Sequence, residues 1–256
     1  MNGLLKQHIL KSLQENMRFD GRKPLDFRKA TVEYDVTKNA EGSARVKFGD
    51  TEVMAGVKME IGKPYPDTPE DGNMMVNAEL LPMSSPEFEA GPPDAESVEV
   101  ARLVDRIIRE SKAIDTKKLL ITKAEKCWVV SIDICTINAA GNLIDASCLA
   151  ALAALSKAVF PEYDGTTINY KKQTTQKVPM LKTPIGVTVV KMDGHFLIDP
   201  TNEEEKVADA RLTVGVTEDG GLCALQKGGD MPLSIDEVDT MIGIAIDKSA
   251  ELRKVL

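Results

Sequence analysis

The sequence predicts an α+β fold made of two related βα modules. Strand-like segments precede helix-like segments in the first half of the chain, and the same order returns in the second half. A polar, turn-rich stretch over 163–183 separates the halves and is the best candidate for a linker. The two halves share this element order without a convincing sequence repeat.

The first half opens with an amphipathic helix over 4–13, where apolar residues recur at helical spacing. A polar turn over 18–24 follows. Segments with strand character, separated by Gly, Pro and Asp, come next, and Gly49-Asp50 between two of them predicts a hairpin. The predicted strands span 30–36, 43–48, 52–61 and 74–81, and a helix spans 96–111.

A long apolar segment over 128–137 predicts another strand. The Ala-rich segment over 143–160 predicts a helix that is buried on most sides and ends at Pro161. Beyond the linker we expect strands at 185–192, 196–198, 210–217 and 222–226, then a helix from about Ser234. The expected units are an N-terminal helix and turn (1–26), an N-terminal domain (27–163) and a C-terminal domain (184–256).

Composition fits a cytoplasmic protein with real cores. The 256 residues are 43% hydrophobic, and no run approaches the roughly 18 apolar residues that a membrane helix needs. Residues 1–15 are interrupted by polar side chains and lack the apolar run of a signal peptide. We therefore expect no membrane partner.

Cysteine and histidine usage predicts neither a metal site nor a cofactor. The four cysteines form no CxxC pair, and there are only two histidines, whereas a zinc site needs clustered ligands. The scarcity of histidine also argues against a Ser-His-Asp centre.

The net charge is −8, from 32 basic and 40 acidic residues. This balance disfavours a free-standing, non-specific nucleic-acid binder, whose affinity comes from many Lys and Arg contacts. RNA stays possible as a partner where basic residues gather in one place.

Such a gathering occurs on the helix predicted over 96–111. At about 100° per residue, five apolar residues share one face, and Arg102, Arg106 and Arg109 form a stripe nearly opposite. One interpretation is a solvated face, with Arg106–Glu110 and Asp105–Arg109 pairs at i,i+4 spacing. The other is a phosphate-facing stripe, since arginine binds phosphate in a bidentate way. Five lysines follow between 112 and 126 and strengthen the second interpretation.

The turn Gly141-Asn142-Leu143 lies between a long strand and a buried helix, where backbone N–H groups often bind an anion. Three features predict a poor anion site here. The turn has no Lys or Arg, Leu143 is apolar, and Asp145 is expected to place a negative charge where an anion would lie. An acidic residue near a helix N-terminus is more simply a partner of the helix dipole.

The acidic residues Asp199, Glu203, Glu204, Glu205 and Asp209 form a third candidate, because carboxylates can hold Mg²⁺. The first four fit a solvated loop more simply. Asp209 differs because it introduces a β-rich run, so we expect it to point toward a neighbouring groove.

Together these stretches resemble the RNase PH family, over nearly the whole chain. The segments that carry the resemblance are Arg18-Phe19-Asp20-Gly21-Arg22, Gly49-Asp50-Thr51, 104–109, 138–149 and Asp209-Ala210-Arg211-Leu212-Thr213. Within that family the chain is most similar to the non-catalytic RNase PH-like subunit of the archaeal exosome core ring. The resemblance implies an RNase PH-like fold, with an N-terminal part like ribosomal protein S5 domain 2 and an RNase PH C-terminal-type domain.

The family phosphorolyses RNA from its 3′ end, and active members hold phosphate with a Gly-Ser/Thr-Arg turn. Gly141-Asn142-Leu143 stands at the matching place and departs from that pattern, so the resemblance implies a degenerate phosphate-binding turn. Asp209 matches an active-site acid of the family and is therefore a vestigial active-site position. No catalytic residue is expected.

The resemblance also implies partners. Silent and catalytic RNase PH-like subunits pair as heterodimers, and three pairs close a ring that RNA-binding cap proteins join. Arg102, Arg106 and Arg109 match the helix that reaches single-stranded RNA near the partner's active site. Two alternatives stay open: a phosphorolytic exoribonuclease using Asp209 and Mg²⁺, and a purely structural ring scaffold.

Overall fold

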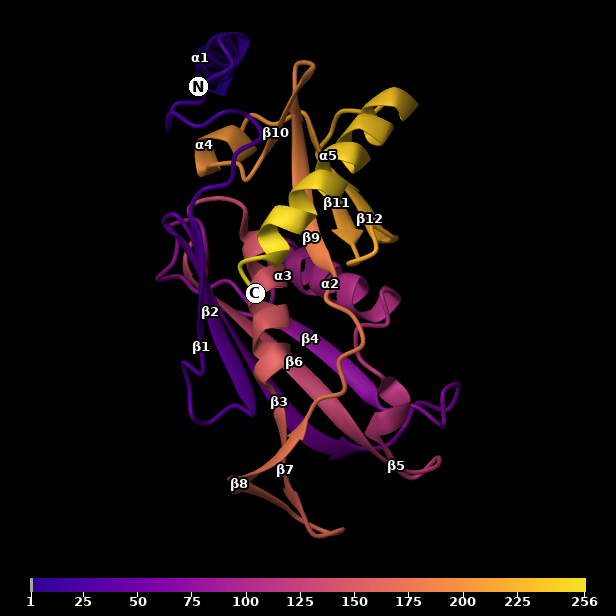
Figure 1. Cartoon of the computed structure of the whole chain (residues 1–256). Coiled ribbons are helices and arrows are strands. Elements are labelled where there is room, and N and C mark those ends of the chain that lie inside the picture. The colour runs from indigo at the N-terminus through magenta and orange to yellow at the C-terminus, as the bar shows by residue number, and fades with distance from the viewer. Residues whose placement is uncertain (1) are drawn as a thin grey trace.

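Two β-sheets enclose a pair of helices in the computed structural model, which describes residues 2–256 and leaves Met1 of the predicted N-terminal unit outside (Figure 1). The N-terminal sheet has the strand order β1-β2-β3-β6-β4, with β5 also on β6. Its strands are β1 (Ala30–Tyr34), β2 (Gly42–Phe48), β3 (Thr51–Gly62), β4 (Asn73–Glu79), β5 (Leu120–Thr122) and β6 (Lys126–Asn138). The C-terminal sheet has the order β10-β9-β11-β12. Its strands are β9 (Ile185–Met192), β10 (His195–Ile198), β11 (Ala210–Val216) and β12 (Leu222–Gly228).

Helices α2 (Ala95–Glu110) and α3 (Leu143–Lys157) lie between these sheets. Helix α3 packs on β2 and β3 on one side and on β9 on the other, while α2 contacts β4, β12 and α3. Helix α5 (Ile235–Arg253) covers the opposite face of the C-terminal sheet along β9 and β11. The remaining helices are α1 (Asn2–Gln14), α4 (Asn202–Glu205) and the short 3₁₀ helix η1 (Thr116–Leu119).

The apolar core is continuous from one sheet to the other. Fully buried residues of the N-terminal sheet, such as Val46 and Ile132, belong to the same cluster as Val187 and Val214 of the C-terminal sheet. The alanines of α3 are the reason this is possible, because small side chains let both sheets approach the helix. A separate cluster joins Ile9 and its neighbours on α1 to β9 and β10.

The predicted α+β order is confirmed, and the β2–β3 hairpin turns at Gly49-Asp50 as expected. Glycine matters at position 49 because it has no Cβ, and its φ of 54° lies in the left-handed region.

Two expectations around the middle of the chain are wrong. Helix α3 ends at Lys157, and Pro161 lies within a strand, β7 (Val159–Tyr163). Gly42 of β2 lies so close to the end of α3 that a Cβ there would lie 2.6 Å from Ala158 Cα. Next to it, Val159 N–H donates a hydrogen bond to Glu41 O. This backbone pairing with Glu41 ends the helix before Pro161.

The segment 163–183, expected to be a turn-like linker, instead contains the ten-residue strand β8 (Ile168–Lys177), which pairs with β7 as an antiparallel hairpin. Its side chains are nearly all exposed, so no apolar alternation marks it in the sequence. Over residues 2–256 no helix combines the length and apolar character needed to cross a membrane.

Candidate nucleic-acid interface and adjoining cleft

Helix α2 is amphipathic as predicted. Asp94 caps its N-terminus by accepting a hydrogen bond from Ser97 N–H at 2.8 Å, and Val104 and Ile107 are among the residues that bury its apolar face. Arg102 and Arg106 are exposed on the other side, as is Arg109. The three guanidiniums, which we call the arginine stripe, therefore share one outer face of α2.

The members of the arginine stripe differ in the hydrogen bonds and ion pairs that they already form within the chain. Arg109 binds Asp105 through two hydrogen bonds of 3.0 and 2.6 Å and also donates to Met74 O at 3.0 Å. The hydrogen bond and charge of Asp105 raise the pKa of Arg109 against the desolvation that lowers it. The expected Asp105–Arg109 pair is thus present.

Arg106 does not pair with Glu110, because it instead donates to Gln226 Oε1 on β12 at 3.1 Å. Within residues 2–256, Arg102 makes no ion pair or side-chain hydrogen bond. Arg102 and Arg106 are consequently the members of the arginine stripe best able to take a phosphate, since neither is bound to a carboxylate.

The turn Gly141-Asn142-Leu143 connects β6 to α3 with left-handed backbone conformations. Gly141 has a φ of 90°, and a Cβ on it would lie 2.4 Å from Pro200 O, so glycine is required for close packing on the loop before α4. Asn142 has φ 57° and ψ 42° and caps α3. Its N–H donates to Glu205 Oε1 at 2.8 Å, and its Nδ2 donates to Asp199 Oδ1 at 2.9 Å.

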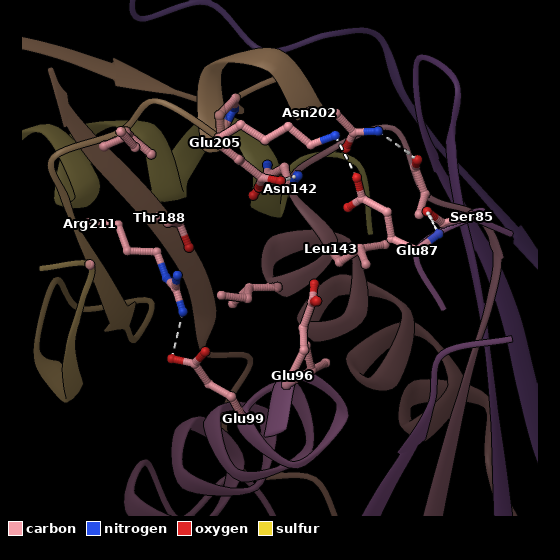
Figure 2. Close-up of a pocket in the computed structure, with 18 of the residues that line it drawn as sticks. Ser85, Glu87, Glu96, Glu99, Asn142, Leu143, Thr188, Asn202, Glu205 and Arg211 are labelled. Atoms are coloured by element: carbon pink, nitrogen blue, oxygen red, sulfur yellow. Dashed lines mark hydrogen bonds and ion pairs between the residues drawn. The ribbon is translucent and has the colours of Figure 1, made fainter. Parts of the chain in front are cut away.

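Leu143 lines a cleft of about 600 Å³ between α2, α3, β9, β11 and α4 (Figure 2). Four carboxylates and two cations line this cleft: Glu87, Glu96, Glu99, Glu205, Lys206 and Arg211. Both cations are already paired, Lys206 with Glu87 at 2.6 Å and Arg211 with Glu99 at 2.6 Å. The cleft is therefore net negative and, among the described residues, offers no uncommitted cation to an anion.

Two carboxyls of the cleft, those of Glu205 and Glu96, have raised pKa values. Desolvation raises the pKa of Glu205 to about 7, with a further contribution from the charge of Glu96. The residue as a whole is exposed, and its carboxyl accepts the hydrogen bond from Asn142 N–H. The pKa of Glu96 is likewise raised, first by burial and then by Asp94.

Asp145 does not lie where an anion would bind, so that expectation is wrong. Its side chain is fully buried and accepts hydrogen bonds from Thr188 N–H at 3.1 Å and Thr188 Oγ1 at 2.7 Å. Burial raises its pKa to about 7. The carboxylates that contact the turn come from further along the chain: Glu205 accepts from Asn142 N–H, and Asp199 accepts from Asn142 Nδ2.

Asp209 also points elsewhere than expected. It forms an ion pair with Lys6 of α1 and accepts a hydrogen bond from Asp193 N–H at 2.7 Å. Desolvation alone would raise its pKa, but the Lys6 hydrogen bond and charge lower it. The neighbouring Arg211 lines the cleft, whereas Asp209 does not.

The expected solvated loop is in part a buried ion-pair network. Asp199 is 0% exposed and pairs with Arg28 and Arg22, and Glu204 is bound by Arg18, which is itself buried. Desolvation would raise the pKa of Asp199, but the hydrogen bonds and charge of Arg28 hold it below its usual range. The Arg-Phe-Asp-Gly-Arg motif therefore joins the N-terminal turn to the C-terminal sheet. Across residues 2–256 no group of three or more His, Cys, Asp or Glu could hold a metal ion.

Comparison with known proteins identifies the family. The model of the 3′ exoribonuclease family, RNase PH, matches residues 26–161 with its domain 1 and residues 182–248 with its domain 2. The chain belongs to the RNase PH family. The resemblance seen in the sequence and the RNase PH-like fold are thereby confirmed.

Similar proteins cover almost the whole chain. The exosome complex component Rrp42 of Methanothermobacter thermautotrophicus is 42% identical over 255 residues, which are 99% of this chain and 94% of that protein. Rrp42 of Methanosarcina acetivorans is 44% identical over 252 residues, covering 98% and 92%. A solved chain of the Archaeoglobus fulgidus exosome with RNA bound to the active site superposes with a TM-score of 0.92 at 42% identity, covering 99% of this chain and 98% of that one.

Proposed function

We propose that this chain is the non-catalytic subunit of a 3′–5′ RNA-degrading exosome ring. In that ring it structures the active site of a catalytic RNase PH-like partner and helps to bind single-stranded RNA. The similar proteins are named exosome components, and one similar chain belongs to an exosome with RNA bound to the active site.

One observation carries the non-catalytic part of the proposal. Phosphorolysis needs an anchor for inorganic phosphate, and the cleft beside the degenerate turn has its two cations, Lys206 and Arg211, already paired with glutamates. Leu143 supplies neither charge nor a hydrogen bond. Asp209, the vestigial acid, is bound by Lys6 outside the cleft lining. An acid without a phosphate anchor does not support attack by phosphate.

The RNA-binding part of the proposal rests on the arginine stripe. Helix α2 contacts β4 and β12, which are edge strands of the two sheets, and both expose apolar side chains: Met75, Leu222 and Leu225. Unpaired edges with exposed apolar residues are suited to pairing with another subunit. Arg102 and Arg106 would then face the junction between subunits, where the partner's active site receives RNA.

By the same proposal, the assembled ring is a trimer of heterodimers, and RNA-binding cap proteins join it. To test it, the chain and a catalytic RNase PH-like partner are incubated separately and together with 3′-labelled RNA, phosphate and Mg²⁺. We expect no nucleoside diphosphate from this chain alone and more from the pair than from the partner alone. Release by the chain alone would instead indicate a phosphorolytic enzyme in its own right.

Charge reversal in the arginine stripe distinguishes our proposal from the alternative of a purely structural scaffold. If the chain only holds the ring together, reversing Arg102 or Arg106 leaves the RNA affinity of the assembled ring unchanged. Our proposal expects the affinity to fall while the ring stays assembled.

A further inference from the structure

Glu205 stands apart from the other carboxylates of the cleft. Glu87 and Glu99 have cationic partners, whereas neither Glu96 nor Glu205 has an ion-pair partner within residues 2–256. Of these two, only Glu205 accepts a hydrogen bond from backbone, and the donor is the N–H of Asn142 in the degenerate turn. A carboxylate oxygen at 2.8 Å from that N–H makes the contact that a phosphate oxygen would make.

We propose that Glu205 is a built-in anion that occupies the phosphate position of the 141–143 turn and keeps inorganic phosphate and RNA phosphates out of the cleft. The inference rests on the proposed function and deepens it. The site is silent because an acidic side chain of the same chain fills it, in addition to lacking an arginine at position 143.

The position of Glu205 is set by the helix that carries it. Helix α4 begins with a capping box, in which Thr201 and Glu204 satisfy each other's backbone N–H groups. Glu204 is in turn bound by the buried Arg18. Because α4 is fixed in this way, its last residue is directed toward the turn, as Figure 2 shows for Glu205 beside Asn142.

The turn is fixed against α4 from its own side. Gly141 packs against the backbone of Pro200 and Thr201, and Asn202 Nδ2 donates to Ala139 O at 3.0 Å. Asn142 holds Asp199 through its side chain, so its N–H is left to meet Glu205. Donor and acceptor are thus carried by two elements that are locked together, so the backbone places the Glu205 side chain within reach of the Asn142 N–H.

This arrangement has a consequence for any attempt to restore the family's anchor. An arginine introduced at position 143 would find the Glu205 carboxylate in the same cleft and pair with it, as Arg211 already pairs with Glu99. Neutralised in this way, the new guanidinium would not hold phosphate. Restoring phosphate binding therefore requires both the arginine and the removal of the Glu205 charge.

The experiment compares full-length wild type, Leu143→Arg, Glu205→Gln and the double variant. The midpoint of thermal unfolding is measured as inorganic phosphate replaces chloride at constant ionic strength, because a ligand that binds only the folded state raises that midpoint. A pH of about 8 keeps the Glu205 carboxyl of the wild type mostly ionised, since its pKa is about 7.

We expect the double variant to bind phosphate at least about tenfold more tightly than Leu143→Arg alone. The matched control is Leu143→Arg with Glu203→Gln, since Glu203 lies on the same helix but outside the cleft lining. This control should respond as Leu143→Arg does. If the double variant does not fold, Glu205→Ala replaces the glutamine substitution.

Equal phosphate responses of Leu143→Arg and the double variant would overturn the inference, and so would a double variant that ignores phosphate. The measurement uses the isolated chain and needs neither RNA nor a partner. Failure of the proposed function would appear separately, as nucleoside diphosphate release by wild-type chain alone.

Discussion

Arg18 and Glu204 form a buried ion pair across 186 residues of sequence. The Arg18 guanidinium also donates to Ile198 O and Asp199 O at 2.8 Å each. The pair fixes the N-terminal turn on α4, the helix whose last residue, Glu205, contacts the 141–143 turn. A motif that marks the family in sequence thus serves here to position one wall of the cleft.

Glu204→Gln should destabilise the protein by about 3–5 kcal/mol, because it leaves a buried guanidinium without its counter-charge. Combining Glu204→Leu with Arg18→Met should cost less than either single substitution, since no lone charge is left buried. Urea unfolding midpoints of the variants measure the changes. As a control, Lys123→Ala breaks an exposed pair with Glu70 and should change the urea midpoint little, because water screens exposed pairs. A Glu204→Gln effect no larger than that of the control would contradict the assignment.

The elements that could be predicted from the sequence are those whose apolar residues recur at a regular spacing. Helix α2 was predicted almost to the residue, because its apolar residues repeat at helical spacing. The exposed strand β8 was missed since its ten residues carry no apolar alternation. The boundary of α3 was misplaced because its end depends on Gly42, which is distant in sequence.

For the site, local chemistry predicts a poor anion site at the 141–143 turn, but the carboxylate expected to oppose an anion there, that of Asp145, lies elsewhere. Asp145 is near in sequence and points into the core, whereas Glu205 comes from a remote helix and meets Asn142 only in the folded chain. Similarly, Arg18 and Arg22 stand in a polar turn, and nothing local indicates that their charges are balanced by Glu204 and Asp199.

Arg102→Glu should weaken binding of single-stranded RNA by the assembled ring roughly tenfold, about 1.4 kcal/mol. Arg102 forms no ion pair within residues 2–256, so it can contact a phosphate without breaking an existing pair. Neutralising it with Arg102→Ala should also reduce the slope of log affinity against log salt by about 0.7. Size-exclusion chromatography checks that the ring stays intact. Lys118→Glu, which lies beyond α2 beside Asp115, is the comparison variant and should change RNA affinity less.

Unlike Arg102→Glu, Arg109→Glu should lower the stability of the fold as well as the RNA affinity. Arg109 binds Asp105 and Met74 O, so reversal places two carboxylates together and removes a link between α2 and β4. We expect a loss of stability of about 1–2 kcal/mol by urea unfolding, in addition to any loss of RNA affinity. Unchanged stability with lowered affinity would show that Arg109 is as free for RNA as Arg102.

Stability should depend on pH through Glu205. Its pKa rises from an ordinary value of 4.5 to about 7 on folding, so the folded chain binds this proton more tightly than the unfolded chain. The contribution to the free energy of unfolding is therefore fully present below pH 4.5 and is lost as pH rises to about 7. Glu205→Gln should remove this part of the pH dependence and be relatively more stable at about pH 8, whereas Glu203→Gln should leave it. Parallel stability curves for wild type and Glu205→Gln between these pH values would refute the expected titration.

Asp209→Asn tests whether this acid serves structure or chemistry. Its carboxylate holds Lys6 and the N–H of Asp193, so it attaches α1 to the turn between β9 and β10. Neutralising it should loosen α1, which would increase cleavage near residue 6 in limited proteolysis by several-fold, for a cost of about 1 kcal/mol. RNA degradation by the assembled ring should not change, because Asp209 does not line the cleft. Lys6→Ala is the matched variant and should loosen α1 to the same extent, since it removes the other half of one ion pair. If Asp209→Asn abolishes RNA degradation while Lys6→Ala does not, the carboxylate acts in chemistry rather than in holding α1.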